Sequence, residues 1–276
     1  MNTNRLSYAV LATLLSAAAF TASAATTVSM CKLDGGKIQV NDLNAFSDVD
    51  AYTGQSKLLP APAYLIKHNG HYMLWDAGLP LSFLGAKINS ADVMSGTVDS
   101  SLRDQLSKIG IDPGSVEIVG LSHTHFDHTG QAGEFPQATL MLGQQDYDDL
   151  SSKSPQVNVD ATTLSHWVSS GGSVRAVSGD TDVYGDGSVR MLSTPGHTSG
   201  HHSLLVQLKS GPVLLTGDVW NFQAQVAING VPPFATNRAD VLASETRLTG
   251  LAKNRKALVV IQHEPADADK IPNCTH

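Results

Sequence analysis

The sequence predicts a layered α/β protein that forms one domain. Leu102, Leu106 and Ile109 lie on one face of a predicted helix, and a turn at residues 112–114 then leads into a short apolar segment at residues 116–121. Further short apolar segments, typical of buried strands, follow along the chain and are separated by turns. The sequence shows no internal repeat, low-complexity tract or linker. A helix that leads into a buried strand, within an undivided chain, favours one α/β domain.

Residues 1–24 have the composition of a secretory signal peptide. Arg5 supplies a positive charge, residues 8–20 form an apolar run too short to span a bilayer, and residues 22–24 form a small-residue cleavage site. The alternative is a buried N-terminal helix, but an alanine-rich helix without a polar face would have to be covered on all sides. We therefore expect residues 25–276 to form the mature domain, in the periplasm or secreted.

The charge and hydropathy of the chain limit its partners. The formal net charge is −7, and cleavage after Ala24 would remove Arg5 and make the chain one unit more negative. A negative chain disfavours binding to a nucleic-acid backbone. The sequence contains no second apolar run long enough to span a membrane. We expect a small-molecule substrate, and the sequence leaves the oligomeric state open.

The two cysteines, Cys31 and Cys274, lie close to the two ends of the expected mature chain. Export to an oxidising compartment favours a disulfide between them, which would tie the first strand to the C-terminal tail. Two unpaired thiols are the alternative. Geometry decides between these readings, so the pairing is a hypothesis at this point.

Residues 63–68 and 72–75 form a predicted β-hairpin, because the Asn-Gly pair between them is the strongest short hairpin signal. The second of these strands ends at Asp76, which on its own reads as a turn residue. Residues 79–99 contain apolar side chains without a clear period. We predict a long loop there, which either carries a binding surface or packs on its own scaffold.

The strongest motif is at residues 122–130, which read Ser-His-Thr-His-Phe-Asp-His-Thr-Gly after the buried strand. If the chain stays extended, His123 and His125 point to the same side and can share one metal ion. Asp127 and His128 follow where the chain turns, and they can converge on a second ion nearby. A solvated polar loop is the alternative, but three imidazoles and a carboxylate directly after a buried strand make it a poor fit.

Three later strands also end at metal-binding residue types. The predicted strand at residues 189–192 leads to His197, the hairpin at residues 203–216 leads to Asp218, and the predicted strand at residues 257–262 leads to His263. Other predicted elements are strands at residues 139–142 and 174–177 and helices at residues 144–150, 161–168 and 239–251. Chance rarely places such a residue at the end of four separate strands.

These residues resemble the metallo-β-lactamase superfamily, and within it the exported N-acyl-homoserine lactonase-like branch. The motifs that carry the resemblance are residues 123–128, Thr-Pro-Gly-His at residues 194–197, Gly217-Asp218 and Gln262-His263. The family has an αββα sandwich fold, with two sheets face to face, helices outside and two zinc ions at one edge. We therefore expect this fold in a single domain.

The resemblance also implies roles for individual residues. One zinc ion would be held by His123, His125 and His197, the other by Asp127, His128 and His263, and Asp218 would bridge both. Asp76 matches a position that orients the ligands from behind. A hydroxide between the two zinc ions would attack a carbonyl carbon without a serine or cysteine nucleophile. His201 is expected to support its loop, and we interpret the other histidines as surface or packing residues, namely His68, His71, His166, His202 and His276.

On the substrate side the sequence departs from the well-known lactonases of this type. They place a tyrosine three positions after the bridging aspartate, where this chain has Asn221. An amide can donate a hydrogen bond, so we count Asn221 with Asp127 and Asp218 as the catalytic candidates. The loop after Asp218 is apolar, which suits an acyl chain or ordinary packing; its candidate substrate residues are Trp220, Phe222 and Phe234, with Ile228 and Val231 beside them.

The resemblance implies a metal-dependent hydrolase that opens the ring of an N-acyl-homoserine lactone, the quorum-quenching reaction. An arylesterase or organophosphate triesterase of the same fold is the alternative. A β-lactamase is less favoured, because those enzymes usually lack an aspartate at the Asp218 position. Thioester hydrolysis would need a separate C-terminal region that the sequence does not show, and a non-catalytic zinc-binding protein would need a broken ligand set.

Overall fold

The protein is described from a computed structural model, and its described residues are 26–152 and 158–275. The predicted signal peptide at residues 1–24 and His276 lie outside them. In this part of the chain, no helix is both long and apolar enough to cross a membrane.

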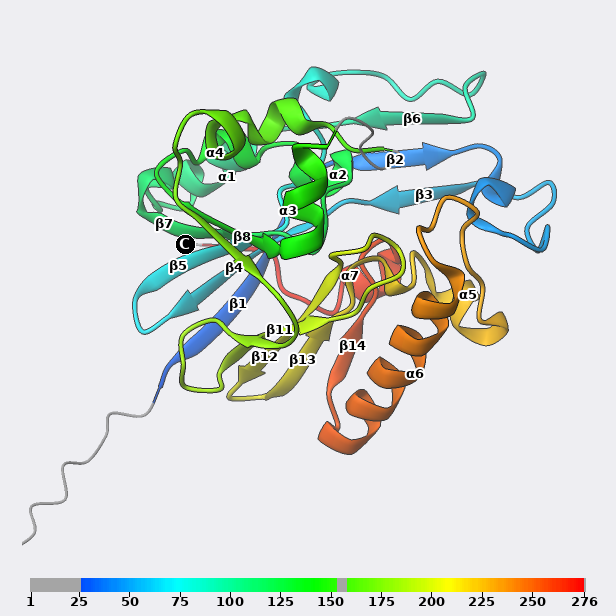
Figure 1. Cartoon of the computed structure of the whole chain (residues 1–276). Helices are drawn as coiled ribbons and strands as arrows, with labels where there is room; N and C mark the ends of the chain where they lie inside the picture. The colour runs from blue at the N-terminus through cyan, green and yellow to red at the C-terminus, as the bar shows by residue number, and fades with distance from the viewer. Residues whose placement is uncertain (1–25, 153–157, 276) are drawn as a thin grey trace, which may run out of the picture.

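Two β-sheets form the middle layers of the described chain (Figure 1). The first sheet has the strand order β1 (Val28–Leu33), β4 (Ala63–His68), β5 (His71–Trp75), β7 (Val116–Gly120), β8 (Thr139–Gly143), β9 (Val174–Val177). The second has the order β10 (Thr181–Asp182), β11 (Val189–Ser193), β12 (His202–Leu208), β13 (Gly211–Leu215), β14 (Leu258–Val260). The predicted hairpins are the antiparallel pairs β4–β5 and β12–β13.

Alternate residues of each central strand enter different parts of the core. In β4, Tyr64 and Ile66 pack between the two sheets, in one cluster with Met191 and Leu204 of the second sheet. Leu65, which lies between them in the sequence, belongs to the cluster beneath the helices instead. Successive side chains of a strand point to opposite faces, so a sheet covered on both faces requires apolar residues at every position. This explains the continuous apolar runs in the sequence.

Helices cover the outer faces of both sheets (Figure 1). The first sheet is covered by α1 (Leu102–Lys108), α3 (Gln144–Leu150) and α4 (Ser165–Ser169), whose buried residues share its outer cluster. The second sheet is covered by α6 (Arg238–Arg255), which buries Leu248 against it. The shorter helices are α2 (Phe126–Thr129), α5 (Gln223–Ile228) and α7 (Pro265–Ala268). The layers are helix, sheet, sheet, helix, which confirms the predicted αββα sandwich.

A third, smaller sheet flanks the sandwich and corrects one prediction. Its strands are β3 (Lys57–Pro60), β2 (Lys37–Val40) and β6 (Met94–Thr97), with β2 in the middle. The prediction of a long loop at residues 79–99 is therefore wrong over β6, and a short 3-10 helix also forms at Leu81–Phe83. The sequence Met-Ser-Gly-Thr has no strand pattern of its own, so β6 exists because β2, far away in the chain, supplies its hydrogen-bonding partner.

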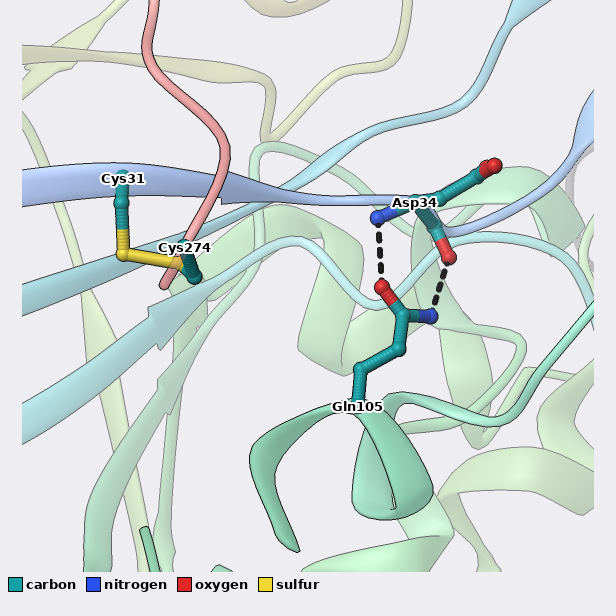
Figure 2. The surroundings of a disulfide bond; sticks show 4 residues. All are labelled: Cys31, Asp34, Gln105 and Cys274. Atoms are coloured by element: carbon teal, nitrogen blue, oxygen red, sulfur yellow. Dashed lines mark hydrogen bonds between the residues drawn. A yellow bond between two sulfur atoms is a disulfide. The ribbon is translucent and has the colours of Figure 1, made fainter. Parts of the chain in front are cut away.

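The N- and C-terminal parts of the described chain are joined covalently. Cys31 in β1 forms a disulfide with Cys274, and the Cys274 backbone N–H donates to the Lys32 carbonyl at 3.0 Å. Figure 2 shows this bridge and, beside it, Asp34 after β1 exchanging two backbone hydrogen bonds with the side chain of Gln105 on α1. The structure thus contains the pairing that the sequence left as a hypothesis.

Candidate metal centre

Seven predicted ligand residues converge at one edge of the sandwich, where their strands end. They are contributed by the segment after β7 with α2, and by the segments after β11, β13 and β14. All seven are buried, and they form three overlapping groups in which the ligand atoms lie within 4.8 Å of one another: His123, His125, His197; His123, His128, Asp218; and Asp127, His128, His263. The first and third groups have the composition that the family resemblance implies for the two ions.

Asp218 lies between the two outer groups. Its Oδ2 atom is 3.4 Å from His197 Nε2, whereas its Oδ1 atom is 3.3 Å from His128 Nε2 and 3.1 Å from His263 Nε2. Each carboxylate oxygen therefore faces ligands of a different group. This is the arrangement that a carboxylate bridging two cations would have.

The donor set fits metal ions better than it fits a self-contained hydrogen-bond network. His123 Nε2 and His197 Nδ1 are buried without a hydrogen-bond partner. Ring nitrogens also face one another, with 3.3 Å between His128 Nε2 and His263 Nε2. Buried polar atoms without partners cost free energy, and nitrogen and oxygen donors that converge from separate strands are the ligands that zinc uses.

Electrostatics divides the histidines into two sets. Burial lowers the pKa of His123 and His197 well below the usual value and that of His125 to about 4, so these rings are neutral and can coordinate a metal. Burial is the largest influence on the pKa of His128 and His263 and acts to lower it, but the nearby carboxylates, Asp218 and Asp127 and for His128 also Asp76, together outweigh it, so the net pKa shift of both rings is upward. The raised pKa favours the protonated form of these two rings, and a bound metal would take the place of that proton.

Asp76 orients His128 from behind. Its backbone has the left-handed φ of 58°, and its buried carboxylate accepts a hydrogen bond from the Ser122 backbone N–H at 2.7 Å through Oδ1. Its Oδ2 atom lies 3.0 Å from His128 Nδ1, which turns His128 Nε2 toward Asp218. The structure therefore places Asp76 where the resemblance implied.

His201 supports the loop and does not belong to any of the three ligand groups. Its Nε2 atom accepts from the Asp218 backbone N–H at 2.9 Å, and its Nδ1 atom lies 3.0 Å from the Thr194 carbonyl. Burial lowers the pKa of His201 to about 3, so the ring is neutral and can accept in this way. Gly217 has a φ of +56°, and a Cβ atom there would lie 2.6 Å from His201 Nε2, so the sequence requires glycine before Asp218.

Asn221 contacts Asp218 directly. Its Nδ2 atom donates to Asp218 Oδ2 at 2.7 Å, while its Oδ1 atom is buried without a partner. The side chain also lines the cavity beside the ligand residues. At the position where the lactonases have a tyrosine, this chain thus has Asn221, whose side chain holds the Asp218 carboxylate between the two ligand groups.

A cavity of about 300 Å³ opens directly onto the ligand residues. It is lined by the ligand residues His125, Asp127, Asp218 and His263, and most of its other lining residues are apolar, namely Ile38, Ala45, Phe46, Leu59, Met94, Phe126 and Phe234. Phe234 is the one predicted substrate residue that lines it, and its ring centroid lies 5.7 Å from that of His197. Sequence reasoning missed the walls from β2, β3 and β6, because no local signal shows that the third sheet folds over the ligands.

Trp220 and Phe222 do not line this cavity, contrary to the expectation from the sequence. Trp220 is buried in the cluster between the second sheet and α6. Phe222 lies behind the cavity wall, with its ring centroid 6.0 Å from that of Phe46 and 5.2 Å from that of Tyr52. Both are apolar because they pack, the alternative that the sequence left open.

The remaining described histidines have roles outside the ligand groups. His68 stacks on Tyr184 at 3.8 Å between ring centroids and bonds to Asp186, and His202 is buried against the Gly200 carbonyl. His71 is exposed, and His166 lies beside Trp167. This agrees with their interpretation as surface or packing residues.

Known proteins with similar sequences belong to a family of this fold. The sequence-family model described as "Metallo-beta-lactamase superfamily" matches residues 57–263. N-acyl homoserine lactonase AttM from Azorhizobium caulinodans is 32% identical over an alignment of 235 residues, and the match covers 75% of this chain and 82% of that protein.

Two solved structures share the fold. A quorum-quenching N-acyl homoserine lactone hydrolase matches with a TM-score of 0.75 at 22% identity, over 90% of this chain and 97% of that chain. The dizinc quorum-quenching lactonase AidC matches with a TM-score of 0.66 at 16% identity, over 86% and 88% of the two chains. The chain belongs to the metallo-beta-lactamase superfamily.

Proposed function

We propose that this protein is a dizinc hydrolase that opens the ring of N-acyl-homoserine lactones. The observation that carries the proposal is the set of three overlapping ligand groups next to a largely apolar cavity. A polar reacting end beside apolar walls suits a substrate that joins a lactone ring to an acyl chain. The names of the relatives, N-acyl homoserine lactonase among them, support the same reaction.

Two zinc ions would be held by the seven ligand residues, with Asp218 between them. One ion would bind His123, His125 and His197, and the other would bind Asp127, His128 and His263. When bound, zinc lowers the pKa of a coordinated water toward neutrality and polarises a carbonyl group. Imidazole and carboxylate are both ligands that zinc uses, and a solved lactonase with this fold is named as dizinc, which supports zinc as the metal.

The side chains around the ligands would prepare the site for this chemistry. Asp76 fixes the ring of His128, and Asn221 fixes one oxygen of Asp218. Asp127 also lines the cavity, where its carboxylate could take a proton from the attacking water and pass it to the leaving oxygen of the opened ring. Phe46 and Phe234 exclude water from the acyl side of the cavity.

A panel of substrates tests this function. Purified zinc-loaded protein should hydrolyse acyl-homoserine lactones with a higher kcat/KM than aryl esters, a paraoxon-like phosphotriester or a cephalosporin. A compact aryl ester or phosphotriester that is turned over faster than any lactone would overturn the proposal in favour of the arylesterase or triesterase alternative.

We infer that the protein is exported and acts in the periplasm or outside the cell. The apolar run and cleavage site at residues 1–24 support this, and so does the Cys31–Cys274 disulfide, because disulfides persist in oxidising compartments. Fractionation of cells that express the full chain, with N-terminal sequencing of the product, tests the inference. We expect periplasmic or secreted protein that begins at Ala25, and a cytoplasmic protein that retains residues 1–24 would contradict it.

A further inference from the structure

Helix α3 reaches across to the loop that carries His197. Its Asp146 side chain is fully buried, and both carboxylate oxygens are used on that loop. Oδ2 accepts a hydrogen bond from Thr198 Oγ1 at 2.7 Å, and Oδ1 accepts one from the Gly200 backbone N–H at 2.7 Å. Asp146 therefore holds the residue directly after His197 and the residue two positions further on.

Two glycines make this close approach possible. A Cβ atom at Gly143, just before α3, would lie 1.9 Å from the Gly200 carbonyl oxygen. A Cβ atom at Gly200 would lie 2.5 Å from the Asp146 backbone nitrogen and 2.8 Å from its Cγ atom. Real Cβ atoms do not approach other atoms so closely, so any larger residue would push the helix and the loop apart. Glycine at both positions thus allows helix α3 and the loop to approach closely enough for the two hydrogen bonds.

The other supports of this loop act on different atoms. The Thr236 backbone N–H donates to the His197 carbonyl at 3.1 Å, and the Asn237 backbone N–H donates to the Gly196 carbonyl at 2.9 Å. Neither reaches the Thr198 hydroxyl or the Gly200 N–H, which are held by Asp146. Hydrogen bonds to a buried carboxylate are stronger than those between neutral groups, so their loss would free the part of the loop that follows His197.

We propose that Asp146 is a positioning residue that fixes His197 for metal binding. The inference rests on the proposed dizinc function, since it needs an ion at the group formed by His123, His125 and His197. Asp146 is in none of the three ligand groups, so it acts through Thr198 and Gly200. Groups that orient metal ligands from behind matter for affinity, and their substitution typically costs about 10–100-fold in metal affinity or activity.

The test compares zinc affinity in matched variants of the mature protein. Asp146→Asn keeps the shape of the side chain but replaces one carboxylate oxygen with an amide nitrogen. The side chain can then no longer accept both hydrogen bonds. Asp148→Asn makes the same chemical change at an exposed position of the same helix, where the Asp148 carboxylate accepts a hydrogen bond from Gln144 Nε2 at 2.8 Å. Competition against a chromogenic chelator gives the zinc dissociation constants, and melting of the metal-free proteins reports the fold.

We expect Asp146→Asn to weaken binding of one of two zinc ions about 10–100-fold, while Asp148→Asn retains the wild-type constants. Thr198→Val should weaken binding of the same ion, because it removes the hydrogen bond from the Thr198 hydroxyl to Asp146. In the double variant the two effects should not add, since both substitutions break the same contact. Thr198→Val also provides the test if Asp146→Asn fails to fold.

Two results would overturn the inference in distinguishable ways. Wild-type protein that binds two zinc ions, together with Asp146→Asn and Thr198→Val proteins of unchanged affinity, would remove the role of Asp146 and leave the proposed function intact. Wild-type protein that binds no zinc would overturn both. Equal weakening of both ions, in proportion to a lower melting temperature of the metal-free variant, would show a general structural role and would also overturn the inference.

Discussion

Asp218 connects the two halves of the candidate metal centre through its two carboxylate oxygens. One oxygen faces His197 and is held by Asn221, while the other faces His128 and His263. The surrounding histidines keep the pKa of Asp218 well below the usual value although burial alone would raise it, so the group is ionised. A single ionised side chain thus sets the spacing of the ligand groups.

Asp218→Ala should reduce zinc content and lactone turnover together, because it removes a ligand from both groups. Asn221→Ala is the matched control, since it removes only the hydrogen bond to Oδ2 and leaves the carboxylate. We expect metal analysis after dialysis to show less than two equivalents for the first variant and about two for the second. Full zinc content in Asp218→Ala would contradict the role of Asp218.

The buried Glu245 on α6 should make the stability of the fold depend on pH. Burial raises the pKa of Glu245 to about 7, with Arg238 and the Trp220 indole acting in the opposite direction. A carboxyl group with a folded-state pKa above its unfolded value stabilises the fold fully at low pH, and this contribution is lost as the pH rises through about 7. Glu245→Gln should therefore stabilise the protein at pH 8 but not at pH 4.5.

The raised pKa of Glu245 corresponds to a change of about 3 kcal/mol at most in the free energy of unfolding. Thermal melting between pH 4.5 and pH 8 measures it, with Asp240→Asn, an exposed change on the same helix, as the control. Parallel pH curves for wild type and Glu245→Gln would contradict the assignment.

At the scale of elements, the third sheet decides the shape of the substrate cavity. Leu59 of β3 lines the cavity, whereas Leu58 points to the opposite side and is 45% exposed. Phe234, on the loop before α6, closes the cavity over the rings of His125 and His197. The apolar walls of the cavity thus come from five separate parts of the chain, at residues 38–46, 59, 94, 126 and 234.

Phe234→Ala should flatten the dependence of kcat/KM on acyl-chain length. Each methylene buried against the apolar wall contributes about 0.8 kcal/mol, or roughly fourfold in kcat/KM, until the cavity is full. Rates on a series of lactones measure this slope. Leu58→Ala, an apolar truncation on the other face of β3, should leave the slope unchanged. If Phe234→Ala lowers all rates equally, the residue does not contact the acyl chain.

The sequence predicts the elements of the sandwich well and those of the cavity poorly. The hairpin at β4 and β5 and the strand before His123 carry local signals, namely an Asn-Gly turn and a β-branched apolar run. β6 carries no such signal because its pairing with β2 is long-range. Trp220 and Phe222 follow Asp218 closely, but the direction of their side chains depends on packing that adjacency in the sequence does not reveal.

At the scale of the whole molecule, one covalent bond joins the first and last parts of the described chain. The disulfide links residues 243 positions apart, and β1 and the C-terminal tail also share backbone hydrogen bonds. In the chain-entropy model, such a bridge stabilises mainly by restricting the unfolded chain, and removal of a native disulfide typically costs about 2–5 kcal/mol.

The double variant Cys31→Ser, Cys274→Ser should therefore melt at a lower temperature than the oxidised wild type, and reduction of the wild type should have the same effect. Thermal melting with and without a reducing agent measures this, and the reducing agent should leave the double variant unchanged. Two free thiols per chain in denatured wild type purified from the periplasm would refute the bridge.

In the proposed function, two zinc ions bound where seven side chains converge carry lactone hydrolysis. Titration of metal-free protein with zinc, while the hydrolysis of an N-acyl-homoserine lactone is recorded, tests it most directly. We predict that activity rises until two equivalents of zinc are bound per chain. Full activity at one equivalent, or no lactone hydrolysis at two, would contradict the account.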